Sequence, residues 1–176
     1  RLEQVVAGSA IDGPGKRADA LLRTSGRIRS MVFAEIKTHR TPLLGREYRS
    51  GCWSPSAELA GGLAQVQGTV HRATLGIGER LADLATDGSE IPGEYTYLLR
   101  PRSFLVVGRL SDLVGEQGGA HADKVRSFEL FRRHLQEPEI LTFDELLARA
   151  EWVVDTAADE AGGSATDGAA EEDIPW

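Results

Sequence analysis

The sequence is poor in cysteine and has no long apolar run, and each absence narrows the class of protein it can encode. Cys52 is the only cysteine among 176 residues, so an internal disulfide or a cysteine-rich zinc site is excluded. A single thiol is typical of a reducing, intracellular compartment. No apolar stretch approaches the roughly 18–20 residues of a membrane span, and no export signal is visible at the start. We therefore expect a cytoplasmic protein with no membrane partner.

Basic residues are absent from the last part of the sequence. Residues 155–176 contain seven acidic side chains, no lysine or arginine, and few apolar groups. This segment accounts for the net charge of −7, because the rest carries 20 acidic and 20 basic side chains. It cannot bury enough apolar surface to offset the entropy of ordering it. We predict one folded domain over residues 1–154 and an acidic disordered tail over 155–176.

Apolar periodicity predicts an α/β fold, a mixed β-sheet flanked by helices. The first strands are separated by turn signals and indicate an antiparallel meander. Residues 40–56, rich in proline, glycine and arginine, are expected to form a loop. The predicted strands cover residues 1–7, 17–23, 28–38, 103–110 and 139–143, and the predicted helices cover 58–82, 122–136 and a segment starting at Asp144.

Five glycines interrupt the helical pattern of residues 58–82. Each costs a helix roughly 1 kcal/mol relative to alanine, which weakens the prediction. Some of these glycines could instead let the helix pack closely on the sheet. Ser54 or Ser56 is suited to cap the N-terminus of this helix.

The segment VFAEIKTH, residues 32–39, combines a buried-strand pattern with three polar side chains. Side chains two residues apart share a face of a strand, so Glu35, Lys37 and His39 point the same way as Phe33. The other face carries small apolar side chains such as Ile36, and we expect it to lie against the core. The polar face is then expected to line a cleft at the end of the strand.

Asp19 lies 16 residues before Glu35, across a predicted turn. A hairpin would bring the two carboxylates to the same end of the sheet. Oxygen ligands of this kind suit a hard cation such as Mg²⁺ or Mn²⁺, and the backbone carbonyl of Ile36 could complete the site. Lys37 is then placed to orient a water or to stabilise charge on a phosphate.

The order of Asp19, Glu35-Ile36-Lys37 and a helical glutamine resembles the PD-(D/E)xK nuclease superfamily. The glutamine is Gln65 or Gln67, and the superfamily spacing favours Gln65. Over roughly residues 15–154, the chain also looks like the C-terminal nuclease domain of the Shedu (SduA) family of anti-phage defence proteins. The segments that carry this likeness are ADALL, FAEIKTH, TPLLGREYRSGCW, SAELAGGLAQVQ, FLVVGRL, SFELFRRHL and EILTFDELLARAEWVV.

The resemblance implies a restriction-endonuclease-like fold and a metal-dependent endonuclease that hydrolyses DNA phosphodiester bonds in phage defence. It also implies DNA as the partner and assembly as a homo-oligomer. By this likeness Asp19 and Glu35, with the Ile36 carbonyl, bind Mg²⁺ or Mn²⁺. Lys37 and Gln65 complete the catalytic set.

Structural interpretations of the same residues remain open from the sequence alone. Glu35 and Lys37 could form an exposed ion pair on an edge strand, which contributes only ~0–1 kcal/mol. Asp19 could cap a turn or pair with Arg17 or Arg23. The fold could also serve a non-catalytic module that binds DNA ends or a partner.

Four further residues are candidate substrate contacts. Arg46 and Arg49 lie in the predicted loop after the strand, and arginine suits phosphate through its planar fork. His39 could contact the scissile phosphate or serve as a second base, and Gln67 could point toward the site. Each of the four could equally be an ordinary surface residue.

Overall fold

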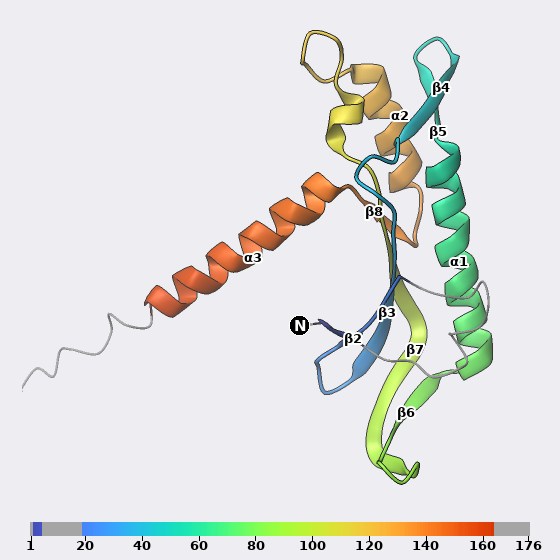
Figure 1. Ribbon diagram of the computed structural model, residues 1–176, viewed down its shortest axis with the longest axis vertical. Helices are drawn as coiled ribbons and strands as arrows, with labels where there is room; N and C mark the ends of the chain where they lie inside the picture. Colours follow the sequence, from blue (N-terminus) through green and yellow to red (C-terminus); the bar gives the residue numbers. More distant parts are fainter. Residues whose placement is uncertain (1, 5–18, 164–176) are drawn as a thin grey trace, which may run out of the picture. The chain divides into compact units, whose positions relative to one another are not determined.

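The computed structural model describes residues 2–4 and 19–163, and the chain divides into two units between Phe143 and Asp144. The described part of the first unit contains a mixed β-sheet, a separate β-hairpin and two α-helices (Figure 1). The second unit is described as one helix. Among the helices of the described residues, none combines the length and apolar character that crossing a membrane requires.

The main sheet has the strand order β1-β2-β3-β7-β6, and β8 also pairs with β7. β1, β2 and β3 form an antiparallel meander, as the sequence predicts. β7 is parallel to β3 and β8 but antiparallel to β6, so the sheet is mixed. The strands are β1 (Leu2–Gln4), β2 (Ala20–Thr24), β3 (Arg29–Ile36), β6 (Arg80–Leu84), β7 (Glu90–Val106) and β8 (Glu139–Leu141).

α1 (Ala57–Ile77) lies in the connection between the parallel strands β3 and β7. Ser56 caps its N-terminus, with its hydroxyl accepting a 2.9 Å hydrogen bond from the Leu59 N–H. The helix ends at Gly78, whose φ of 79° is readily adopted only by glycine. α1 lies along the sheet (Figure 1), and its apolar side chains contribute to a core cluster with the strands. The buried residues of this core cluster are Leu21, Met31, Phe33, Ala73 and Leu98.

A second core cluster joins the ends of β7 and β8 to the start of α1 and to α2 (Ala122–Arg133). A hairpin of β4 (Leu44–Arg49) and β5 (Cys52–Pro55) lies beside α2, where the Trp53 N–H donates to the Ser127 hydroxyl at 3.1 Å. The buried members of this cluster are Leu43, Leu59, Leu105, Val107, Leu113, Phe128 and Ile140.

The prediction of a mixed α/β sheet with helices is confirmed, but several elements were missed. The β4–β5 hairpin occupies the predicted loop 40–56, and β6 was not predicted. β7 begins 13 residues before the predicted strand 103–110, and the short 3₁₀ helix Leu110–Leu113 follows it. β4 and the first residues of β7 are largely exposed, and β5 and β6 are at most half-buried, so no apolar periodicity marked these strands.

α3 (Phe143–Gly163) makes up, from Asp144 onward, the described part of the second unit. The predicted domain boundary at residue 154 falls inside this helix, which continues nine residues further. The rest of the predicted disordered tail, residues 164–176, lies outside the described residues. Arg17 also lies outside them.

Candidate active site

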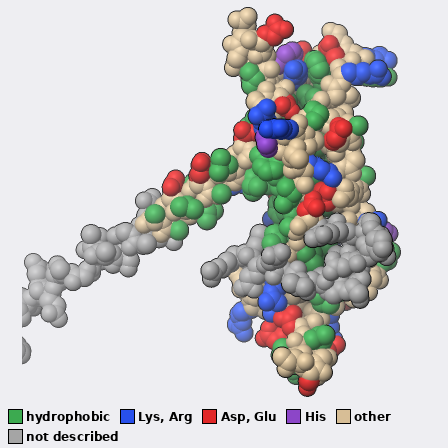
Figure 2. Space-filling view, in the orientation of Figure 1, with side chains coloured by type: hydrophobic (Ala, Val, Ile, Leu, Met, Phe, Trp, Pro, Cys, Tyr) green, Lys and Arg blue, Asp and Glu red, His purple; other side chains and the backbone are tan. Residues whose placement is uncertain are grey.

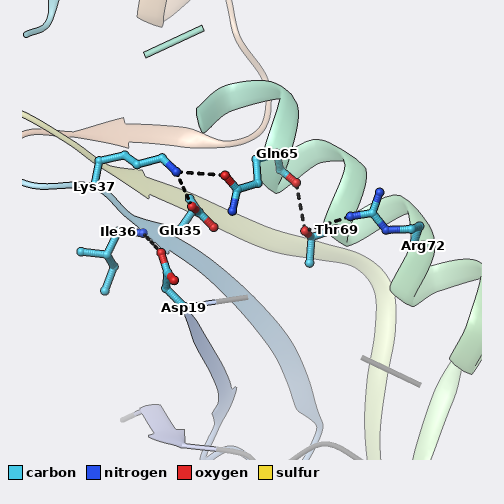
Figure 3. A network of polar contacts seen from close by, with 7 residues as sticks. All are labelled: Asp19, Glu35, Ile36, Lys37, Gln65, Thr69 and Arg72. Atoms are coloured by element: carbon cyan, nitrogen blue, oxygen red, sulfur yellow. Dashed lines mark hydrogen bonds and ion pairs between the residues drawn. The ribbon is translucent and has the colours of Figure 1, made fainter. Parts of the chain in front are cut away.

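The candidate site lies where β3 ends between β2 and β7. Lys37 follows the strand and still pairs with β7, because its N–H donates to the Val106 carbonyl at 2.9 Å. Neighbouring residues of a strand direct their backbone groups to opposite sides. The N–H of Ile36 accordingly points to the β2 side, where it donates to Asp19 Oδ2 at 2.8 Å. Asp19 thus ties the start of β2 to the end of β3 (Figure 3).

The assignment of the two faces of β3 from the sequence was partly wrong. Phe33 is fully buried and packs with Ala73 of α1, so α1 covers the face that also carries Glu35 and Lys37. Ile36, expected to lie against the core, is 46% exposed. The polar face of β3 therefore meets a helix instead of opening directly into a cleft.

Lys37 links the strand to α1. Its Nζ donates to Glu35 Oε1 at 2.7 Å and to Gln65 Oε1 at 2.9 Å (Figure 3). Glu35 is only 3% exposed, and β3 is an internal strand, so the alternative of an exposed edge pair is wrong. An ammonium group has three N–H donors, and among the described residues two of those of Lys37 have acceptors.

Gly62 lets the Lys37 side chain lie against α1. A Cβ at this position would be 3.3 Å from Lys37 Cε and 3.1 Å from a methyl group of the buried Leu105. The sequence offered one signal for this contact, the Gly61-Gly62 pair within a helical pattern. The expectation that some glycines allow close packing is confirmed at Gly62, whereas at Gly61 a Cβ would meet nothing within 4 Å.

Burial raises the pKa of the Glu35 carboxyl above its ordinary value of 4.5. The hydrogen bond from Lys37 acts in the opposite direction, and the nearby Asp19 carboxylate raises the pKa of Glu35 further by charge repulsion. Because the two carboxylates repel each other at one end of the strand, a cation bound between them would stabilise their charged forms.

These residues fit a small, hard divalent cation. Within the described ranges, no three His, Cys, Asp or Glu side chains are grouped to hold a metal ion. Asp19, Glu35 and the carbonyl of Ile36, which points to the same side of β3 as its N–H, are the oxygen donors that such a cation would use. Mg²⁺ typically binds through one or two carboxylates and keeps several waters, so this sparse set suits it.

Of the two arginines that could pair with Asp19, Arg17 lies outside the described residues and Arg23 contacts another carboxylate. Arg23 donates to Asp83 at 3.1 Å. On α1, Thr69 donates to the backbone carbonyl of Gln65 at 2.9 Å, and Arg72 contacts the Thr69 hydroxyl at 3.5 Å. This polar row, drawn in Figure 3, was not predicted from the sequence.

The remaining predicted substrate contacts are not part of this cluster. The His39 ring meets the Phe143 ring edge-on, with centroids 6.2 Å apart. Gln67 lies on another side of α1, where its amide donates to the Glu137 carbonyl at 3.2 Å beside a hollow of about 610 Å³. Arg46 and Arg49 are exposed on β4.

Comparison with known proteins finds similarity along most of the chain. The family described as Shedu protein SduA, C-terminal, matches residues 2–147. Shedu protein SduA of Bacillus cereus (strain B4264) is 28% identical over 153 residues. That alignment covers 86% of this chain but 38% of the relative, so the chain spans well under half of the relative's length.

Proposed function

Because the chain belongs to the family of Shedu SduA C-terminal domains, we propose that it is a metal-dependent DNA endonuclease acting in anti-phage defence. The observation that carries the proposal is the convergence of Asp19, Glu35, Lys37 and Gln65 at the end of β3. The order of these residues matches the PD-(D/E)xK pattern. In this proposal the mixed sheet is of the restriction-endonuclease type, and assembly as a homo-oligomer stays a prediction.

The proposed reaction is hydrolysis of a phosphodiester bond by in-line attack of water. Asp19, Glu35 and the Ile36 carbonyl would hold Mg²⁺ or Mn²⁺, which when bound supplies Lewis-acid activation of phosphate and water. Lys37 would use its third N–H to hold the attacking water or a phosphate oxygen. Gln65 would keep the Lys37 amine in place, and burial of Glu35 would strengthen the local electrostatics.

The first test combines cleavage with folding. Glu35→Gln and Lys37→Met should abolish Mg²⁺-dependent cleavage of DNA while circular dichroism and the unfolding midpoint show a folded domain. Glu79→Gln is the matched control, since Glu79 is exposed just beyond α1 and should cleave like the wild type. Cleavage by Glu35→Gln at the wild-type rate would contradict the proposal.

The second test measures metal binding directly. Asp19→Asn keeps an oxygen acceptor for the Ile36 N–H but removes the charge, so the strand ends should stay joined while affinity for Mn²⁺ falls. Isothermal titration calorimetry of both proteins reports this without any DNA. Equal Mn²⁺ affinity in both would exclude Asp19 as a ligand.

One observation favours a second candidate function, a DNA-end or partner-binding module without catalysis. Asp19 and Lys37 already have hydrogen-bond partners within the chain, as in a purely structural network. DNA binding with neither Mn²⁺ binding nor cleavage would favour this module.

If the protein is a nuclease, comparing its cleavage of linear, nicked and branched DNA would define the class of nuclease.

A further inference from the structure

A hollow of about 300 Å³ lies on the chain segment that follows the candidate site. Arg40 is three residues after Lys37, and three residues span at most roughly 11 Å. Successive base pairs of DNA rise 3.4 Å, so the backbone of Arg40, at one side of the hollow, lies within about three nucleotide steps of the Lys37 backbone. Its lining residues are Arg40, Pro42, Leu44, Gly45, Trp53, Asp112 and Lys124.

The charged groups of this hollow are incompletely matched. Within the described part of the chain, neither Arg40 nor Lys124 forms an ion pair. Asp112 uses Oδ2 to accept the Leu43 N–H at 3.1 Å, and its other oxygen has no bond among the described residues. The hollow therefore has one surplus positive charge and one available carboxylate oxygen. Lysine and arginine side chains also gather near the β4–β5 hairpin in Figure 2.

Trp53 supplies an aromatic wall. Lys124 Nζ lies 4.9 Å from the ring centroid, a contact that contributes only roughly 0.5–1 kcal/mol at an accessible site. A ligand that stacks on the ring and carries a phosphate can displace the ammonium from the ring and take it as a phosphate partner. The Trp53 Nε1 atom is enclosed without a hydrogen-bond partner in the described residues, so the indole is not held by its polar atom.

We propose that this hollow binds one unpaired nucleotide of the DNA strand beside the candidate active site. The base stacks on Trp53, as bases of single strands do on aromatic side chains. Asp112 accepts a hydrogen bond from the amino group of the base, and Arg40 and Lys124 contact the adjoining phosphates. This inference rests on the proposed function, because it takes DNA as the substrate.

The charged groups that line the hollow determine which base it prefers. Phosphate contacts alone would leave the Asp112 carboxylate repelling the ligand, whereas a base with an exocyclic amino group turns it into a partner. Cytosine, adenine and guanine have such a group, whereas thymine offers only its N3–H, whose two flanking carbonyl oxygens repel a carboxylate. The hollow is at the lower end of the roughly 300–1,000 Å³ of small-ligand sites, which favours a single nucleotide over a longer segment.

The test measures affinity for short single-stranded oligonucleotides in EDTA, where no metal-dependent cleavage occurs. Oligo-dC should bind more tightly than oligo-dT, and an abasic strand should bind weakest. Trp53→Leu should weaken oligo-dC binding by about 5- to 150-fold, the equivalent of one lost stacking contact. Trp53→Phe keeps an aromatic ring and should lose less affinity for oligo-dC. This variant serves as the test if Trp53→Leu disturbs folding.

Asp112→Asn separates base recognition from packing. The amide oxygen still accepts the Leu43 N–H, so the fold should hold while the preference for oligo-dC over oligo-dT falls. Tyr48→Leu is the matched aromatic control, because Tyr48 is exposed on β4 outside the hollow and should leave the preference unchanged. Lys124→Met should weaken dC and dT strands but not reverse their order.

The outcomes separate this inference from the proposed function. Oligonucleotide binding that depends on Trp53 and Asp112, without Mg²⁺-dependent cleavage of any DNA, would support the nucleotide site and overturn the nuclease. Cleavage together with equal affinities for dC, dT and abasic strands, in the wild type and in the Trp53 variants, would overturn the nucleotide site alone.

Discussion

Replacing Gly62 with alanine tests how closely α1 packs on the Lys37 side chain. The added Cβ would lie 3.1 Å from a Leu105 methyl group and 3.3 Å from Lys37 Cε. Both distances are shorter than the roughly 3.5–4.0 Å of favourable carbon contacts. Gly61 is the matched position on the same helix, since a Cβ there meets nothing within 4 Å.

The two substitutions have the same effect on helix propensity but differ in how much they crowd their neighbours. Alanine stabilises a helix interior by roughly 1 kcal/mol over glycine at either position. At Gly62 the crowding of Leu105, which is fully buried, and Lys37 costs roughly 1–3 kcal/mol, as in overpacked cores. Gly61→Ala should therefore stabilise the domain by about 1 kcal/mol. Gly62→Ala should be neutral or destabilise it by up to about 2 kcal/mol.

Urea unfolding monitored by circular dichroism gives the free energy of unfolding for both variants and the wild type. Thermal midpoints should separate by about 2–4 °C for each kcal/mol of difference at this chain length. Equal stabilisation by the two alanines would refute the close packing of Gly62 against Leu105 and Lys37. If the nuclease proposal holds, Gly62→Ala should also lower cleavage by displacing the Lys37 amine, and Gly61→Ala should not.

Three further predictions concern single contacts. Ser56→Ala should lower the free energy of unfolding by about 0.5–2 kcal/mol, because it removes the side chain that caps the Leu59 N–H. Ser54→Ala is the control and should lower it by less, and urea unfolding measures both. The pKa of Glu35 is raised in the folded state. Its contribution to the free energy of unfolding is therefore fully present below pH 4.5 and is lost as the pH rises through the folded-state pKa. Glu35→Gln should thus gain stability relative to the wild type as the pH rises from 4 to 7. A relative loss of stability over this range would contradict the burial argument. Gln65→Ala should lower cleavage by releasing one of the two bonds that hold Lys37, measured by kcat at saturating Mg²⁺.

The parts of the fold that bury a continuous apolar stripe were predictable. β3, α1, α2 and β8 all begin within about two residues of the predicted positions, because each has apolar side chains at a regular period. β4, β6 and the first half of β7 were missed, since almost none of their side chains is fully buried and their pairing is set by neighbouring strands. α3 extends beyond residue 154 through alanine-rich sequence, which favours helix even where few apolar groups are available.

The candidate site was predictable as a set of residues and less so as an arrangement. In the structure Gln65 bonds to Lys37, whereas Gln67 bonds to the Glu137 carbonyl, and the catalytic role of Gln65 stays a prediction. The role of Asp19 as an acceptor for the Ile36 N–H was not foreseen. Both contacts join segments that lie 17 or more residues apart, and local periodicity carries no information about such pairs.

The sequence by itself determined which side chains share a face and where the charged groups stand. Glu35 and Lys37 are on one face of β3 because side chains alternate along any strand, whatever surrounds it. Only the tertiary structure decided that α1 covers this face, that Glu35 is buried there, and that Ile36 is left exposed. It also placed Trp53 and Lys124 beside Arg40. The reason is physical: alternation follows from backbone geometry within one segment, whereas burial depends on which distant segment packs against it.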